Sequence, residues 1–195
     1  MRNMSFDPIW IAWRLRRLLG VVPIIYALCA VAPERAATPE SGPEGPNWAS
    51  LSIGFEELFV PMAATSREED KALERAVTSY RERKAVDDFG ALENFLADHP
   101  QSGWRVAVLT NLGLAYYRSG YFSKTIEMLQ RAWSEGREAT EPKAKALVDR
   151  AVGELLRMHA RLGHSEQLAA LLVDIGQRGL TGPATELWTG ATEGL

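Results

Sequence analysis

The chain has 195 residues, of which 46% are hydrophobic, so it is long enough for one domain with a buried core and a separate targeting segment. Its formal net charge of −3 gives no general attraction to nucleic-acid phosphates, and we expect no nucleic-acid partner. Cys29 is the only cysteine, which leaves the rest of the chain without a thiol for a disulfide, a zinc cluster or a nucleophile.

Residues 1–37 show the order of features that is typical of an export signal. Arginines precede an uncharged apolar run, 18–32, and small and polar residues follow it. The run is shorter than the roughly 20 residues that a membrane-spanning helix needs. Cleavage and retention as a membrane anchor through residues 1–32 both remain open, and a misassigned start codon or a peripheral amphipathic segment is the alternative. The signal predicts an extracytoplasmic location in the periplasm, the cell envelope or outside the cell.

Residues 38–63 are predicted to form a tether. Prolines and glycines are frequent between residues 33 and 46, which favours a flexible linker. The second half of the tether is different, because residues 50–62 include the apolar side chains Leu51, Ile53, Phe55, Leu58 and Phe59. The sequence leaves open whether this stretch stays free or docks on the domain that follows, where it would occlude a binding groove.

Residues 64–195 are predicted to form an all-α domain of six or seven helices. Apolar residues recur three and four positions apart between helix breakers. Ser66 followed by Glu69 is a capping-box pattern that opens the first helix. The expected helices cover about 66–83, 89–98, 102–119, 123–136, 140–163, 165–176 and 183–192. We expect Ser102, Ser123, Thr140 and Ser165 to cap the later helices. Loops this short join antiparallel neighbours, so the helices should form hairpins.

The third and fourth expected helices carry a characteristic spacing of large and small residues. Within residues 106–139 these are Leu112, Gly113 and Tyr116, then Gly120 at the turn, then Ile126, Leu129 and Ala132. This unit resembles a tetratricopeptide repeat (TPR), although Thr125 replaces the usual alanine. The small Gly113 and Ala132 would permit a close helix crossing. A weaker match follows 43 residues further along the chain. The resemblance implies a stack of about three helix hairpins.

A broader resemblance covers residues from about 92 to 195. It is carried by residues 95–100, 112–114, 125–132, 149–155 and 190–195. These are similar to the TPR segment near the front of large exported bacterial proteins that also have a papain-like peptidase region and YD-type repeats. No peptidase cysteine or histidine motif occurs here, so no catalytic residue carries over. The resemblance implies an alternative function, that of the substrate-recognition arm of a split or truncated exported peptidase or YD-repeat protein. The few charges in residues 183–195 favour a missing downstream region.

Residues with catalytic or metal-binding chemistry are sparse. The histidines are His99, His159 and His164, and none has the helical spacing of a two-histidine metal site. We expect His99 to lie at a helix end, His159 to be buried and His164 to be solvated. Neither a phosphate-binding loop nor a paired acid and base is evident. We therefore expect no enzyme activity, no metal and no cofactor.

The TPR resemblance implies a set of groove residues, because the first helix of each pair lines the concave face of such an array. They are Thr110, Asn111, Leu114, Tyr117 and Arg118 in the matching unit, and Arg150, Glu154, Arg157 and Arg161 in the weaker one. In peptide-binding members of the family, an asparagine at the position of Asn111 holds the backbone or terminal carboxylate of a ligand. The arginines would pair with acidic groups.

The expected partner is therefore a protein or peptide segment with acidic groups or a C-terminal carboxylate. A simpler interpretation of the same residues remains open. Arg150 and Glu154 are spaced for an ordinary pair within one helix, so the second set would then be a solvated helix face. An asparagine also occurs at the position of Asn111 in repeats that hold no ligand.

Overall fold

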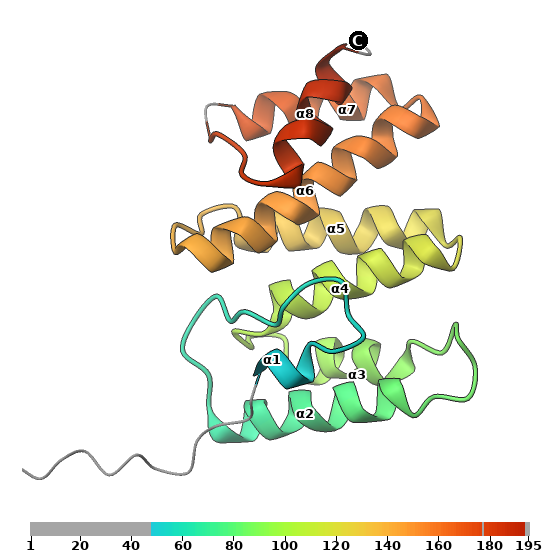
Figure 1. Cartoon of the computed structure of the whole chain (residues 1–195), viewed down its shortest axis with the longest axis vertical. Coiled ribbons are helices and arrows are strands. Elements are labelled where there is room, and N and C mark those ends of the chain that lie inside the picture. Colours follow the sequence, from blue (N-terminus) through green and yellow to red (C-terminus); the bar gives the residue numbers. More distant parts are fainter. Residues whose placement is uncertain (1–47, 177, 194–195) are drawn as a thin grey trace, which may run out of the picture. The chain divides into compact units, whose positions relative to one another are not determined.

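A computed structural model describes residues 48–176 and 178–193 of the chain. This part is all-α, with eight helices and no strand among the described residues, which confirms the predicted class (Figure 1). The helices are α1 (Trp48–Leu51), α2 (Arg67–Arg81), α3 (Gly90–Asp98), α4 (Arg105–Arg118), α5 (Phe122–Gly136), α6 (Pro142–Leu162), α7 (Ser165–Ile175) and α8 (Pro183–Glu193). The predicted signal or anchor over 1–37 and the tether residues 38–47 lie outside the described residues.

Two helix ends follow the signals that the sequence predicts. At the start of α2, the Glu69 backbone N–H donates to Ser66 Oγ, and the Ser66 N–H donates to the Glu69 carboxylate, so the capping box is complete. At the end of α6, Gly163 has a φ of 68°, in the left-handed region that glycine adopts without strain. Local sequence is therefore sufficient to place these two boundaries.

The other predicted N-caps differ from the structure. Helices α4, α5 and α7 follow Trp104, Tyr121 and His164, none of which makes a side-chain cap hydrogen bond. Helix α6 is capped by Glu141, whose carboxylate accepts from the Ala144 backbone N–H, and not by Thr140. The serines and the threonine expected as caps are therefore not the N-cap residues of these four helices.

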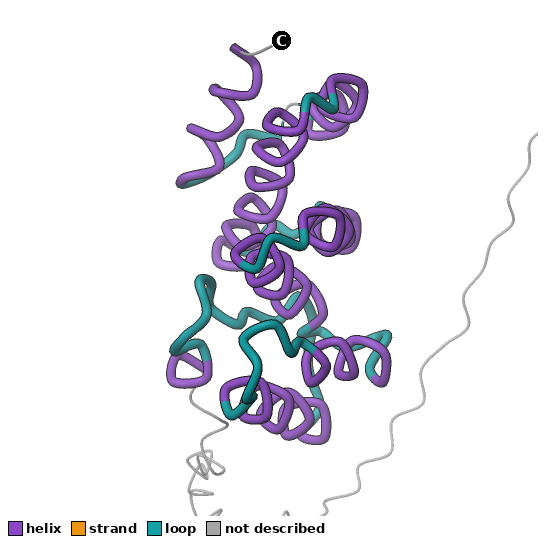
Figure 2. The backbone as a smooth tube through the Cα atoms, turned by 90° about the vertical axis from the view of Figure 1, so that its right-hand side faces the viewer, coloured by secondary structure: helices purple, strands orange, loops and turns teal. Residues whose placement is uncertain are grey.

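Helices that are adjacent in the chain pack against each other, α2 with α3, α4 with α5, α5 with α6, and α6 with α7 (Figures 1 and 2). Helix α6 also packs against α4 and α8. The close crossing predicted at Gly113 is confirmed, since a Cβ there would lie 2.8 Å from Leu129 Cδ2. A second close approach was not predicted: a Cβ on Gly136 would lie 2.5 Å from Val148 Cγ2. The close spacing of α4, α5 and α6 therefore depends on glycine at positions 113 and 136, where any side chain would clash with the neighbouring helix.

Residues 48–63 belong to the packed helical domain, so the tether does not extend to residue 63 as predicted. Leu51 and Phe59 are buried, and the ring of Trp48 lies 4.2 Å from that of Trp104. The Phe59 N–H donates to Ser52 Oγ at 3.0 Å, which closes a loop between the two buried anchors. The apolar side chains of this stretch explain the difference, because burying them stabilises a docked conformation.

Candidate binding groove

The groove lies between the facing sides of α4 and α6, and the domain's own chain occupies it. Of the predicted residues, α4 supplies Asn111, Leu114, Tyr117 and Arg118, and α6 supplies Arg150, Glu154, Arg157 and Arg161. The occupying residues are 53–58, which we call the groove segment. In Figure 1 the loop that contains them crosses α4 and runs below α6. Sequence reasoning left this docking open, and the structure shows that it occurs.

Asn111 binds the backbone of the groove segment through both ends of its carboxamide. Its Oδ1 accepts from the Glu57 N–H at 3.0 Å, and its Nδ2 donates to the Glu57 carbonyl oxygen at 3.1 Å. The same Nδ2 donates to the Ala107 carbonyl oxygen at 3.1 Å, which fixes the orientation of the side chain on α4. Because Asn111 is buried, these hydrogen bonds satisfy polar groups that would otherwise be costly to bury. They recognise a backbone, and not a particular side chain.

The two carboxylates of the groove segment meet arginines from both helices. Arg118 lies 3.3 Å from Glu56, while Arg150 lies 3.5 Å from Glu56 and 3.1 Å from Glu57. Arg150 also pairs with Glu154 at 2.7 Å, so three carboxylates converge on one guanidinium. Within the described part of the chain, the buried Nε of Arg150 makes no hydrogen bond despite its proximity to Glu57. The charge of Arg150 is therefore met by carboxylates, although the geometry at its Nε is poor for a hydrogen bond.

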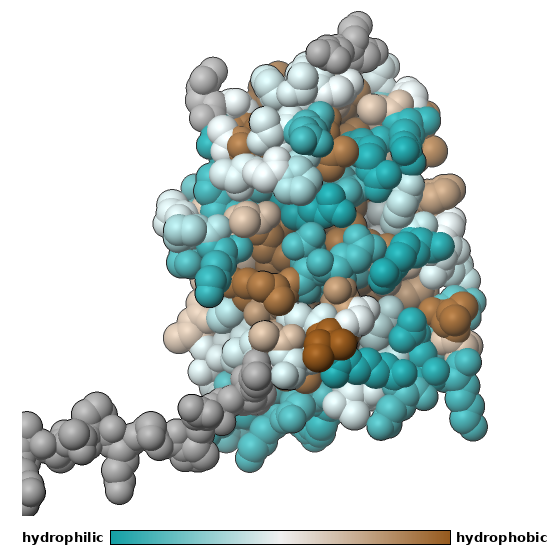
Figure 3. Space-filling model, viewed as in Figure 1, coloured by the Kyte–Doolittle hydropathy of each residue, from teal (hydrophilic) through white to brown (hydrophobic). Residues whose placement is uncertain are grey.

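The surface of the domain reflects this concentration of charge. Figure 3 shows hydrophilic side chains gathered over the middle of the face on which the loop crosses between α4 and α6, with hydrophobic side chains at its edges.

Glu57 is not in a favourable place for a charged group. Burial raises the pKa of its carboxyl above the ordinary value, Arg150 counteracts this, and the negative charges of Glu56 and Glu154 add to the increase. The desolvation of the carboxylate is therefore not fully compensated by its arginine partner.

The other predicted arginines are held in a cluster further along the groove. The Tyr117 hydroxyl accepts from Arg161 Nη1 at 2.7 Å and from Arg157 Nη1 at 3.1 Å. Arg157 also lies 4.5 Å from the centre of the Tyr117 ring and hydrogen-bonds Glu154, whose side chain is 5% exposed. A buried glutamate held by two arginines does not fit a solvated helix face. This cluster joins α4 to α6.

Two predicted residues do not line an accessible surface. Thr110 is fully buried, and its hydroxyl donates to the Val106 carbonyl oxygen at 2.8 Å within α4. Leu114 is 2% exposed. Neither side chain therefore presents an accessible surface to a ligand.

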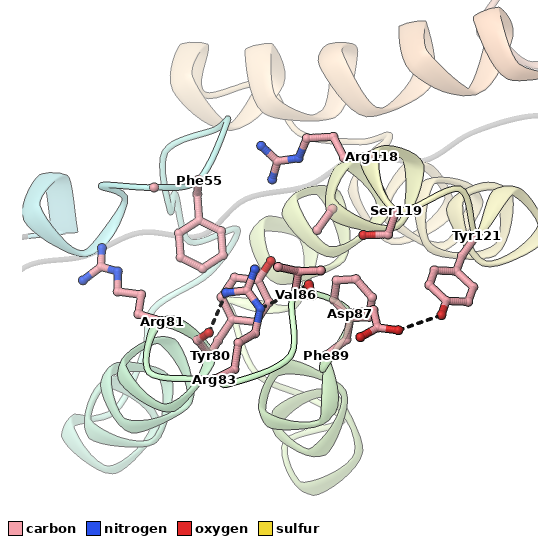
Figure 4. A pocket seen from close by; sticks show the side chains of 12 residues that line it. Phe55, Tyr80, Arg81, Arg83, Val86, Asp87, Phe89, Arg118, Ser119 and Tyr121 are labelled. Atoms are coloured by element: carbon pink, nitrogen blue, oxygen red, sulfur yellow. Dashed lines mark hydrogen bonds between the residues drawn. The ribbon is translucent and has the colours of Figure 1, made fainter.

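An aromatic pocket adjoins the groove at Arg118 (Figure 4). Phe55 of the groove segment points into it, and its ring lies 5.2 Å from that of Tyr80 in a stacked arrangement. The cavity has a volume of about 700 Å³, and its other lining side chains include Phe89, Tyr121, Arg81 and Arg83. Figure 4 shows Arg118 extending over the pocket toward Phe55. The pocket thus receives the aromatic residue that precedes the two glutamates.

Sequence reasoning missed a second buried polar cluster around Asp149 on α6. This carboxylate is fully buried and accepts from Lys145 at 2.5 Å, from Arg178 at 3.1 Å, and from the N–H and hydroxyl of Thr181 at 3.0 and 2.7 Å. Burial alone would raise the pKa of Asp149, but the hydrogen bonds from Lys145, Thr181 and Arg178 outweigh it and the pKa lies below its usual value. The cluster fixes the chain between α7 and α8.

The histidines have structural surroundings. His99 follows the last residue of α3, as expected, and its ring lies 4.9 Å from that of Phe95. His159 is buried, and His164, which was expected to be solvated, is half-buried with its Nδ1 3.3 Å from that of His159. Burial, followed by the neighbouring His164, lowers the pKa of His159. The described side chains include no group of three or more histidines, cysteines or carboxylates that could hold a metal.

Comparison with protein-family models, with curated proteins and with solved structures gave no match. None of the helices in the described part of the chain has both the length and the apolar character that crossing a membrane requires. The function must therefore be argued from the groove itself.

Proposed function

We propose that this chain is a non-catalytic protein-binding module, exported or tethered to the cell envelope, in which TPR-type helix pairs present a groove for an extended protein segment. In this proposal α4 and α5 form one pair and α6 and α7 the next. The expected location depends on residues 1–37, which carry the pattern of an export signal.

The observation that carries the proposal is the pairing of Asn111 with both polar backbone groups of Glu57. A side chain that binds the N–H and C=O of one residue holds a segment by its backbone, whatever its side chains. The arginines beside it supply charge-assisted contacts that backbone pairing lacks. A groove with these two elements is suited to hold a peptide segment of another protein.

A capture experiment with the full chain tests this function. The tagged protein is compared with the double variant Asn111→Ala, Arg118→Glu as baits for the detergent-solubilised envelope fraction of the source organism. Arg131→Glu is the control for the charge change, because Arg131 is half-exposed on α5, away from the groove. We expect a partner that the wild type and the control retain and the double variant loses. A partner retained equally by all three proteins would place the binding function on another face.

A further inference from the structure

The charge of the groove without its segment indicates what it accepts. Once residues 53–58 are set aside, one negative side chain, Glu154, remains against four arginines, which leaves three positive charges in excess. The arginines are Arg118, Arg150, Arg157 and Arg161. The groove segment supplies two negative charges, those of Glu56 and Glu57. An empty groove therefore attracts an acidic segment.

The contacts of the groove segment define three adjoining positions. The aromatic pocket takes Phe55, Arg118 with Arg150 takes Glu56, and Asn111 with Arg150 takes the backbone and carboxylate of Glu57. The next residue, Leu58, is 56% exposed, so the groove encloses it less than it encloses Phe55 and Glu57. The pattern that the groove accommodates is thus an aromatic residue followed by two acidic residues, in a chain that turns and bends over residues 52–57.

The groove segment has the features of an occupant that can be exchanged. Its ends are anchored by the buried Leu51 and Phe59, whereas Ile53 is 70% exposed. Gly54 has a φ of 87°, and a Cβ there would meet open space, so the backbone can reverse direction at this glycine without strain. The ion pair of Glu56 with Arg118 is half-exposed and contributes little to holding the segment.

The fit of the segment is also incomplete. Arg150 is shared among three carboxylates, and its Nε lies 3.1 Å from Glu57 without the alignment of a hydrogen bond. Space also remains in the pocket of about 700 Å³ beside Phe55. A segment from another chain, free of the short loop that joins Leu51 to Phe59, can adjust its position to fill the pocket and align with the arginine.

We infer that the groove binds an acidic segment of a partner protein, with an aromatic residue followed by two acidic residues, in place of residues 53–58, which occupy it in the free chain as an internal mimic. This inference rests on the proposed groove function and specifies its ligand. Because only the open groove binds the partner, the apparent affinity is the intrinsic affinity multiplied by the fraction of chains in which the groove is open.

The test uses the full chain and a fluorescently labelled peptide with the sequence of residues 52–60, SIGFEELFV, followed by fluorescence anisotropy. The opening variant Glu56→Lys, Glu57→Lys places two cations of the groove segment against Arg118 and Arg150. The matched control Glu127→Lys, Glu138→Lys makes the same charge change at carboxylates that are 59% and 94% exposed. A second peptide with glutamine at both glutamate positions tests the need for acidic groups.

We expect the opening variant to bind the acidic peptide at least tenfold more tightly than the wild type and the matched control. Adding Asn111→Ala to the opening variant, or using the glutamine peptide, should each weaken binding at least tenfold. Circular dichroism establishes that each variant keeps its helices.

Three results would overturn the inference. The first is a folded opening variant that does not bind the acidic peptide, and the second is equal binding of the acidic and glutamine peptides. The third is a wild-type dimer in analytical ultracentrifugation that the opening variant dissociates, because the occupant would then be a second copy of this chain. The two proposals can fail separately. If the opening variant does not bind the peptide, but a partner from the envelope fraction is still lost in the Asn111→Ala, Arg118→Glu variant, only the ligand class is wrong and the proposed function stands.

Discussion

Replacing Asp149 by alanine should destabilise the domain more than any substitution of an exposed ion pair. The carboxylate is fully buried and accepts hydrogen bonds from Lys145, Arg178 and Thr181. In Asp149→Ala the ammonium of Lys145 and the guanidinium of Arg178 lose this partner while remaining 23% and 14% exposed. The Thr181 N–H also loses its acceptor.

Removing one partner of a buried ion pair costs about 3–5 kcal/mol. Because water reaches both cations in part, we expect the lower end of that range, about 3 kcal/mol. Domains have total stabilities of about 5–15 kcal/mol, so the loss is a large fraction. For a domain of this size it corresponds to a decrease in Tm of about 6–12 °C.

Urea unfolding followed by circular dichroism measures this free energy on the full chain. Glu127→Ala is the control, because Glu127 forms a pair with Arg131 at 3.9 Å on the surface of α5 and is 59% exposed. That substitution should cost less than about 1 kcal/mol. If Asp149→Ala costs no more than Glu127→Ala, the Asp149 cluster does not stabilise the domain and our reasoning about it is wrong.

Gly136→Ala should lower the free energy of unfolding in urea by about 1–3 kcal/mol, because the new Cβ would lie 2.5 Å from Val148 Cγ2. The control Gly190→Ala in α8 should be neutral or stabilising, because a Cβ there would have no atom within 4 Å. Equal effects of the two substitutions would contradict the close approach of α5 and α6. The pKa of His159 is lower in the folded protein than in the unfolded chain, so the unfolded chain binds a proton at this residue first as the pH falls. The free energy of unfolding should therefore decrease as the pH falls from about 6.5 through the lower folded-state pKa. The urea midpoint should therefore decrease from pH 7.5 to pH 5.5 in the wild type and less in His159→Gln, and an identical decrease in both proteins would exclude His159 as its source.

Local signals in the sequence were enough for much of the fold. The spacing of apolar residues predicts the all-α class and a helix in each of the seven expected ranges, because helical periodicity depends on residues three and four positions apart. The capping box at Ser66 and the small residue at Gly113 were predicted for the same reason, since each depends on a few neighbouring residues or on one crossing. Serines near the other helix starts gave wrong N-cap predictions, because the helices begin after Trp104, Tyr121 and His164.

The sequence by itself determined the positions of helices α2 to α8, whereas only the tertiary structure decided which segment lies against α4 and α6. Asn111 and Glu57 are 54 residues apart, and no local pattern specifies that they pair. In the same way, Asp149 meets Thr181 only because α6 packs beside the chain that leads into α8. Helical periodicity is a local property of the chain, but the partner of a buried polar group depends on which distant segments share its surroundings.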